Sequence, residues 1–347
     1  MRLFRPKTKD EHRSLEVNIY TDYKGPFGLP AVYSTPEAPA TIRGYVEFDC
    51  FEDFTAGDLD LHFRVKSEAK WDRHYGEAHV VYHSKEVLQE ENFHYDLPHV
   101  KPGVVAAGRS KHEFEVQLQP LLPSSVKGSR GWLSYRFTAT LHRPFPRRDI
   151  VFKQDIWCFN TIQNAASPDR IPEQLMSTGV WENCLPYSCC LPSEKVALGS
   201  LVPMTIRFDP FLQESGHFGQ QLVVVSAVVK LKQYTYLWHK RDTYNEKKEA
   251  LTLDVDDEWP SGSHGWERTI MVPITPAPRL SATTYTKPMR KTHKLKLIMK
   301  IRTNSQSDKE AKEFRVEMDV TMTAPRPPHE LPNEQLPKYS ELDDADD

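Results

Sequence analysis

Alternation of apolar and polar residues, repeated in segment after segment, is the feature that most constrains how this chain can fold. In residues 59–65, Leu59, Leu61, Phe63 and Val65 fall on one face of a strand, with polar or charged side chains on the other. The same period of two recurs in residues 14–20, 41–48, 111–119, 132–141, 149–159, 201–208, 221–231, 266–274, 293–301 and 314–323. This pattern predicts β-strands along almost the whole chain.

The segments between these strands have the composition of turns. The 27 prolines fall almost entirely in them, together with glycine and serine. Residues 84–92 are the best short helical candidate. Many short strands and scarce helices predict an all-β fold of antiparallel β-sandwiches. A chain of 347 residues is long enough for two in tandem.

Composition shifts predict the domain boundaries. Residues 1–165 form the first sandwich, residues 166–180 a polar linker and residues 181–324 the second sandwich. Residues 325–347 are rich in proline and then acidic, and such a stretch cannot bury enough apolar surface to order itself. We therefore expect a disordered carboxy-terminal tail.

Overall charge and cysteine use limit the class of protein. The 45 basic and 48 acidic residues nearly cancel, which argues against a nucleic-acid-binding protein. The longest apolar run, residues 222–229, is far shorter than a membrane span, and the amino terminus lacks the apolar region of a signal peptide. Five cysteines, with an adjacent pair at Cys189 and Cys190, make a poor disulfide framework. We expect a soluble cytoplasmic protein with reduced thiols.

Motifs for catalysis or metal binding are weak. No GxSxG elbow occurs, so a serine nucleophile of that kind cannot be built. His79 and His83 would share a strand face, but a metal would need a third ligand such as His74, and we interpret them as solvated or core histidines. We therefore predict no catalytic centre, no metal site, no cofactor and no small-molecule substrate.

Basic residues cluster in two places. Arg143, Arg147 and Arg148 lie in one predicted turn. The second cluster consists of Lys287, Arg290, Lys291, Lys294 and Lys296. Either cluster could bind a phosphorylated cargo tail or an anionic membrane surface. The alternative interpretation is that they are ordinary solvated turns and strand faces.

A short motif in the tail is the sharpest functional signal. Leu336, Pro337 and Tyr339 form a close variant of the Pro-Pro-x-Tyr peptide that WW domains bind. Proline favours the extended polyproline II backbone that docks in an aromatic groove, and the tyrosine ring fills a second pocket. Leu336 keeps an apolar contact but loses some of the pre-organisation that proline would give.

Both halves of the chain resemble the α-arrestin family, in the compact form common in fungi. In the first half the resemblance lies in residues 107–144, which include the Tyr-Arg-x-x-Ala strand at 135–139, and in residues 44–46 and 59–71. In the second half it lies in residues 191–211, 228–238 and 289–301. The resemblance implies an arrestin-like fold of two β-sandwich domains.

The resemblance also implies a function. α-Arrestins are non-enzymatic adaptors that recruit a WW-domain HECT ubiquitin ligase to plasma-membrane transporters or receptors, which are then ubiquitinated, endocytosed and sorted. Of this chain's residues, Leu336, Pro337 and Tyr339 fit the ligase motif, although the motif is single and its first proline is replaced. The resemblance further implies a cytoplasmic protein recruited to the plasma membrane or endosomes. The alternative is a ligase-independent arrestin-fold scaffold in vesicle sorting or in receptor or pH signalling.

Overall fold

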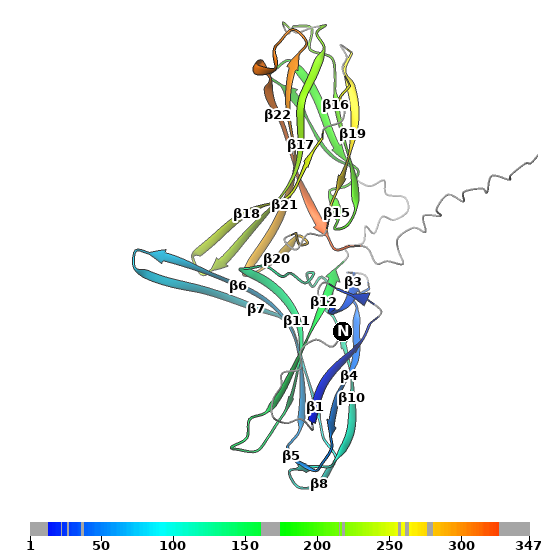
Figure 1. The fold of residues 1–347 in the computed structure, drawn as a ribbon, viewed down its shortest axis with the longest axis vertical. Helices are drawn as coiled ribbons and strands as arrows, with labels where there is room; N and C mark the ends of the chain where they lie inside the picture. Colours follow the sequence, from blue (N-terminus) through cyan, green and yellow to red (C-terminus); the bar gives the residue numbers. More distant parts are fainter. Residues whose placement is uncertain are drawn as a thin grey trace, which may run out of the picture.

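A computed structural model of the chain shows a fold built from strands (Figure 1). The structure describes residues 13–325, apart from 22, 26–27, 36–37, 161–173, 215, 217–218, 256–257, 261–263 and 276–279. Within these residues there is no α-helix, and η2 (Asp308–Glu310) is a 3-10 helix of three residues. None of the described residues belongs to a helix with the length and apolar content needed to cross a membrane. The all-β prediction is confirmed.

The first sandwich packs two sheets face to face. One sheet has the order β1 (Arg13–Tyr20), β4 (Thr41–Cys50), β10 (Gly108–Gln117). The other has the order β2 (Tyr23–Lys24), β3 (Pro30–Ser34), β12 (Ile150–Asn160), β11 (Gly131–Leu141), β6 (Leu59–Tyr75), β7 (Ala78–Tyr95). A small sheet at one end has the order β5 (Phe54–Thr55), β9 (Val104–Val105), β8 (His99–Lys101).

The second sandwich repeats this arrangement. One sheet has the order β13 (Leu175–Trp181), β14 (Leu185–Leu191), β16 (Leu201–Phe208), β19 (Trp266–Pro273). The other has the order β15 (Lys195–Ala197), β22 (Lys312–Thr323), β21 (Met289–Thr303), β17 (Leu222–His239), β18 (Asp242–Asp254), with β20 (Thr284–Thr286) pairing to β21. Pairing is antiparallel throughout, except that β3–β12 and β15–β22 are short parallel pairs.

Each sandwich has its own core, formed by the inward residues of its alternating strands. In the first, the Phe137 ring centroid lies 4.7 Å from those of both Phe63 and Phe114, which joins the two sheets. In the second, Phe314 packs edge-on against Phe208 and Tyr187. Burying each such ring contributes about 1.5–3 kcal/mol to folding.

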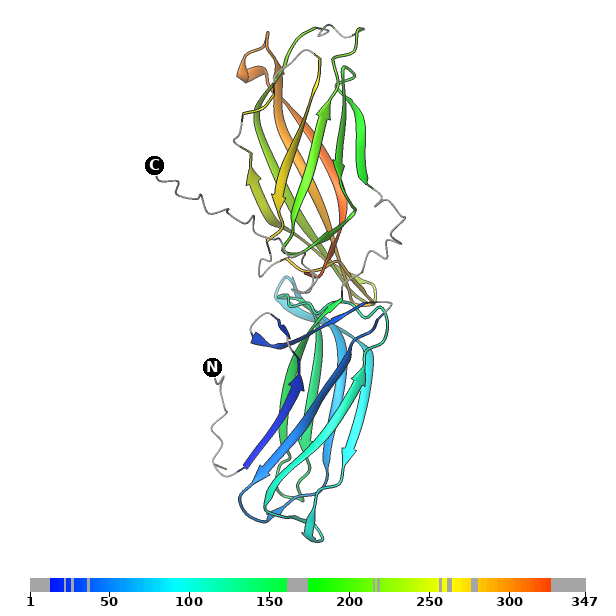
Figure 2. The same cartoon turned by 90° about the vertical axis from the view of Figure 1, so that its right-hand side faces the viewer.

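The two sandwiches stack end to end and meet at two long hairpins (Figures 1 and 2). The β6–β7 hairpin of the first lies beside the β17–β18 hairpin of the second, and both project on the same side of the molecule. Leu237 on β17 and Met289 on β21 are fully buried in the core of the first sandwich. The Ser67 and Thr286 hydroxyls lie 2.8 Å apart across the junction. The junction is therefore packed and hydrogen-bonded.

Two local predictions change. Residues 84–92, the helical candidate, belong to β7, because this strand pairs with β6 along its whole length and that pairing overrides the helical preference of the segment. Strand β13 begins at Leu175, inside the predicted 166–180 linker, because its backbone pairs with β14. The rest of the boundary and the predicted tail beyond Pro325 lie outside the described residues, so the domain limits stay a prediction.

Candidate functional sites

The turn between β11 and β12 carries the three arginines predicted as a basic patch. Asp149 fixes the turn: one carboxylate oxygen accepts a hydrogen bond from the Arg143 backbone N–H at 2.9 Å, and the other lies 3.3 Å from His142 Nδ1. Between these anchors Phe145 projects with 97% of its surface exposed. Pro144 and Pro146 flank it. The sequence interpretation missed this aromatic ring, although a phenylalanine between two prolines in a basic turn was a signal for it.

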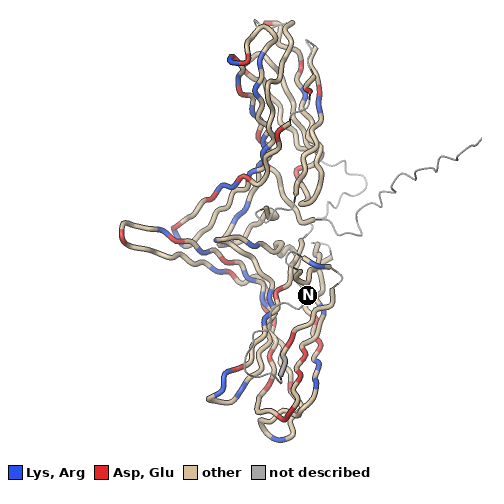
Figure 3. Tube along the Cα trace, in the orientation of Figure 1, with Lys and Arg blue, Asp and Glu red and all other residues tan. Residues whose placement is uncertain are grey.

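The three arginines do not form one surface. The Arg143 guanidinium lies over the Phe54 ring, 5.2 Å from its centroid, and is half-buried. Arg147 and Arg148 are exposed beside Phe145. In Figure 3 the Lys and Arg colour marks this loop at the lower end of the first sandwich. The arrangement offers two guanidinium groups and an aromatic ring to an anionic partner.

A carboxylate bridges two histidines next to this turn. Asp60 lies 2.7 Å from His94 Nδ1 and 2.8 Å from His142 Nε2. The hydrogen bond to Asp60 raises the pKa of each histidine. Burial alone would raise the pKa of Asp60, but the hydrogen bonds from His94 and His142 outweigh it and lower that pKa. Asp149 also lies against His142, so this network and the basic turn are one continuous unit.

The second basic cluster is not a continuous exposed patch. Lys291 is 4% exposed and Lys296 is 2% exposed. Burial lowers the pKa of Lys291 to about 8, and its ammonium group lies 3.3 Å from the Ser281 hydroxyl. Lys296 is paired with Glu317 on β22. Lys291 lies on the inward face of β21, whereas Lys296 lies on the other face and is covered beside Glu317. The cluster therefore offers a partner less charge than the sequence alone would indicate.

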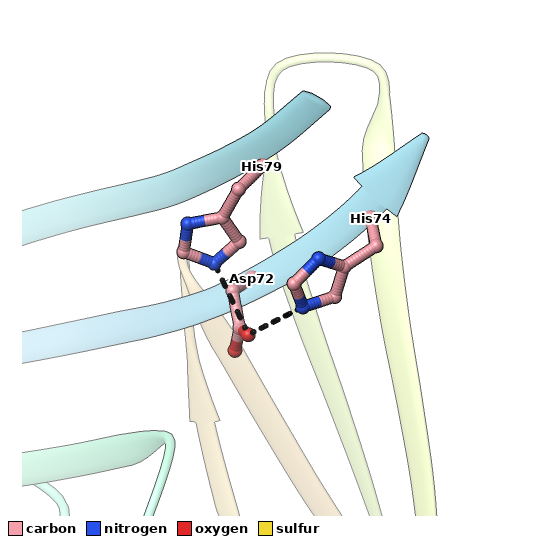
Figure 4. Close-up of side chains that lie close together, drawn as sticks. All are labelled: Asp72, His74 and His79. Atoms are coloured by element: carbon pink, nitrogen blue, oxygen red, sulfur yellow. Dashed lines mark hydrogen bonds and ion pairs between the residues drawn. The ribbon is translucent and has the colours of Figure 1, made fainter. Parts of the chain in front are cut away.

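Asp72, His74 and His79 gather near the end of the β6–β7 hairpin (Figure 4). The imidazole rings of His74 and His79 stack with centroids 4.7 Å apart. His79 Nε2 lies 3.3 Å and His74 Nε2 3.9 Å from the same Asp72 carboxylate oxygen. His83, the partner considered from the sequence, is instead 3.3 Å from Glu68. Asp72 was missed because its approach to His79 depends on how two strands pair.

A second group that could hold a metal ion lies at the other end of these strands. It consists of Asp58, His94 and Asp96. Its histidine already bonds Asp60 through Nδ1, and its carboxylate oxygens lie 3.7 and 3.8 Å from His94 Nε2. One imidazole and two carboxylates make a weaker donor set for zinc-like metals than two imidazoles and a carboxylate.

The predicted ligase-binding motif cannot be placed in this geometry. Leu336, Pro337 and Tyr339 lie outside the described residues.

Comparison with known proteins bears on both sandwiches. Residues 30–165 match the family model described as "Arrestin (or S-antigen), N-terminal domain". The chain is 26% identical over 211 residues to the HECT-type ubiquitin ligase-interacting protein creD of Emericella nidulans, which covers 56% of this chain and 34% of that protein. It is 22% identical over 250 residues to an arrestin domain-containing protein of Schizosaccharomyces pombe, covering 69% and 40% respectively.

A shorter match points the same way. The HECT-type ubiquitin ligase-interacting protein apyA of Emericella nidulans is 30% identical over 116 residues, which is 33% of this chain and 30% of that protein. The matched regions thus span 30–40% of the length of these three relatives.

Proposed function

Since the chain is a member of the α-arrestin family, we propose that it is a non-enzymatic adaptor between a HECT-type ubiquitin ligase and a membrane protein. The ligase binds through its WW domains, and the cargo is a plasma-membrane transporter or receptor. Ubiquitination of the cargo then leads to its endocytosis and sorting. In this role the chain is cytoplasmic and is recruited to the plasma membrane or to endosomes.

The observation that carries this proposal is the similarity to proteins named for their interaction with HECT-type ligases. That similarity extends over 56% of the chain in one relative. It is reinforced by the tail, where Leu336, Pro337 and Tyr339 supply the apolar, proline and aromatic positions of a WW-binding peptide. A single motif gains no avidity from linked copies, so binding to one WW domain sets the strength of recruitment.

Calorimetric titration of the full chain with the WW domains of a HECT ligase tests the motif directly. We expect Tyr339→Ala to abolish binding because the ring fills its own pocket. Leu336→Pro should bind more tightly than the wild type, because a second proline pre-organises the extended backbone before binding.

Lys338 provides the control, because it occupies the variable position of the motif. Lys338→Ala should keep wild-type affinity while Tyr339→Ala loses it. Equal binding by wild type and Tyr339→Ala, or none by either, would reject ligase recruitment through this motif. The ligase-independent scaffold would then be the better account of the chain.

The β11–β12 turn supports a role for an anionic membrane surface in the same function. Phe145 is almost fully exposed between prolines, and Arg147 and Arg148 are exposed next to it. An aromatic ring beside cationic groups suits the interface of a bilayer that contains acidic lipids. Asp149 holds the turn in place through His142 and the Arg143 backbone. These contacts do not use the side chains of Arg147 or Arg148, so both guanidinium groups keep their charge for a partner.

Sedimentation with phosphatidylcholine vesicles, with and without phosphatidylserine, tests this surface. Reversing both charges with Arg147→Glu and Arg148→Glu should weaken binding to acidic vesicles at least about tenfold, because each arginine near such a surface contributes about 1 kcal/mol. Lys300→Glu with Lys309→Glu makes the same change in net charge at exposed positions of the second sandwich and should have little effect. Equal loss in both double variants would reject a localised site, and retention of a phosphopeptide but not of vesicles would assign the turn to cargo.

A further inference from the structure

We propose that Asp72, His74 and His79 form a binding site for Zn²⁺ on the β6–β7 hairpin. Two imidazole nitrogens and one carboxylate oxygen converge there, and all three donor atoms lie within 4.8 Å of one another (Figure 4). None of the three residues belongs to the tail motif or to the basic turn, so the proposal does not depend on the adaptor function.

Strand pairing sets the positions of the three residues. His74 and His79 are directly opposite each other, one pair before the last pair of the hairpin, Tyr75 and Ala78. Gly76 in the connecting turn has φ +62°, a conformation that glycine adopts without strain, so the turn is tight and the register is fixed. Asp72 is two residues before His74 and therefore lies on the same face.

The distances between donor atoms are close to those around a tetrahedral metal ion. Bonds of about 2.0–2.1 Å place neighbouring donors about 3.3–3.4 Å apart in such a site. The separation is 3.3 Å between His79 Nε2 and Asp72 Oδ2, and 3.9 Å between His74 Nε2 and the same oxygen. The side chains are about half to two-thirds exposed, with Asp72 46%, His79 49% and His74 71% exposed, so small rotations can close the remaining gap.

The donor set selects the metal. Imidazole nitrogen suits zinc, copper and nickel, whereas calcium and magnesium prefer a full shell of oxygen ligands. Three protein ligands leave at least one position of a zinc ion for water or for a group from another molecule. The exposure of the cluster makes that position accessible from solvent.

The opposite face of the hairpin is already occupied. Arg73 donates a hydrogen bond to the Thr243 carbonyl on β18, and Trp71 stacks on Tyr82 with ring centroids 5.3 Å apart. Trp71 also lies 6.4 Å from the Tyr244 ring of the second sandwich. Residues 71 and 73 therefore face the junction, while residues 72 and 74 alternate to the other side. Zinc can bind there without displacing the contacts between the sandwiches.

Titration of EDTA-treated full-length protein with ZnCl₂, followed by calorimetry, tests the site. The double variant His74→Gln and His79→Gln should bind one fewer zinc ion at the tightest site than the wild type. Asp72→Asn should weaken that site about tenfold or more, since even losing an outer hydrogen-bond partner of a metal ligand costs 10–100-fold. X-ray absorption at the zinc edge should show nitrogen and oxygen donors at about 2.0–2.1 Å in the wild type.

His83 supplies the matched control. It is a histidine on the same strand and face as His79, but it pairs with Glu68 and is not in the cluster. His83→Gln should keep the wild-type zinc stoichiometry and affinity, with CD spectra confirming that all variants are folded. Two results would overturn the proposal: the double variant binding zinc as tightly and in the same number as the wild type, or His83→Gln losing as much binding as the double variant.

Discussion

The Asp60 carboxylate lies between two histidines, His94 and His142. Its two carboxylate oxygens lie within 2.8 Å of His94 and His142, and the hydrogen bonds raise the pKa of both imidazoles above the usual value of about 6.5. Removing this negative charge should return both values toward that of free histidine. We expect Asp60→Asn to lower the pKa of both, measured by the pH dependence of imidazole NMR shifts.

The same shifts make stability depend on pH. A histidine whose pKa is higher in the folded chain than in the unfolded chain stabilises the fold. This contribution is complete at pH values below the unfolded-state pKa, and it is lost as the pH rises through the folded-state pKa. Asp60 has a lowered pKa in the folded chain, so its pH dependence has the opposite sign. Its contribution to stability is present at pH values above its unfolded-state pKa and is lost as the pH falls through its folded-state pKa. The difference in melting temperature between wild type and Asp60→Asn should therefore be largest near pH 6 and shrink toward pH 9.

Asp155 provides a control for these measurements. It pairs with Arg136 in the same sandwich, with one contact of 2.5 Å, and contacts neither His94 nor His142. Asp155→Asn should leave both histidine titrations as in the wild type. Unchanged histidine titrations in Asp60→Asn would show that Asp60 does not control them.

The residues that carried the family resemblance in β11 have structural roles. Tyr135 is fully buried, and its hydroxyl donates a hydrogen bond to the Pro123 carbonyl at 2.6 Å. The Arg136 guanidinium donates two hydrogen bonds to the Asp155 carboxylate on β12. Ala139 is fully buried in the core. The residues of this motif stabilise the sheet and the core, so the motif predicts the fold and not the cargo.

At the scale of a strand, Gly44 in the middle of β4 has no room for a side chain. A Cβ there would lie 2.2 Å from the Asn18 carbonyl oxygen and 2.7 Å from the Phe114 ring. Gly44→Ala should force β1 or Phe114 to move, at a cost of about 1–3 kcal/mol or more in the free energy of unfolding. Chemical denaturation followed by tryptophan fluorescence measures this cost.

Gly57 is the matched control for Gly44→Ala. The nearest atoms to a Cβ at Gly57 are 3.8 and 3.9 Å away, at His142, which is ordinary van der Waals contact. Gly57→Ala should change the free energy of unfolding by much less than Gly44→Ala. Equal effects of the two substitutions would mean that the close approach of β1 and β4 does not limit position 44.

Strands with one buried face were predictable from the sequence, whereas β7 was predicted only around residues 79–83 and β18 was not predicted. The residues 201–208 predicted as a strand match β16, whose burial alternates along its length. β7 and β18 lie at the edges of their sheets and are mostly exposed or half-buried on both faces. They form by pairing with β6 and β17, and the sequence of one segment does not show which strand it will pair with.

The candidate sites also differ in whether the sequence alone could predict them. Leu336, Pro337 and Tyr339 form a contiguous motif, so the sequence alone suffices to propose it. The approach of Asp72 to His79 and of Asp60 to both His94 and His142 depends on strand pairing or on packing across the chain. The arginines of the basic turn were predicted as a group, but the stacking of Arg143 on Phe54 required the fold.

At the scale of the whole molecule, the second sandwich inserts two side chains into the core of the first. Met289 and Leu237 are fully buried there, and a Cβ added to Gly131 on β11 would lie 2.7 Å from the Met289 sulfur. Met289→Ala should therefore destabilise the first sandwich, although Met289 belongs to a strand of the second. We expect a loss of about 2–5 kcal/mol and faster hydrogen exchange of backbone amides near Gly131.

Met299 separates this coupling from simple destabilisation. It lies on the same strand, β21, and is equally buried, but it packs in the core of the second sandwich. Met299→Ala should speed amide exchange in the second sandwich and leave β11 protected, whereas Met289→Ala should expose β11. If both variants changed exchange in the second sandwich alone, the junction would be a surface contact without a shared core. If the pattern holds, any bound molecule that shifts one sandwich also changes the packing of the other, because Met289 and Leu237 link their cores.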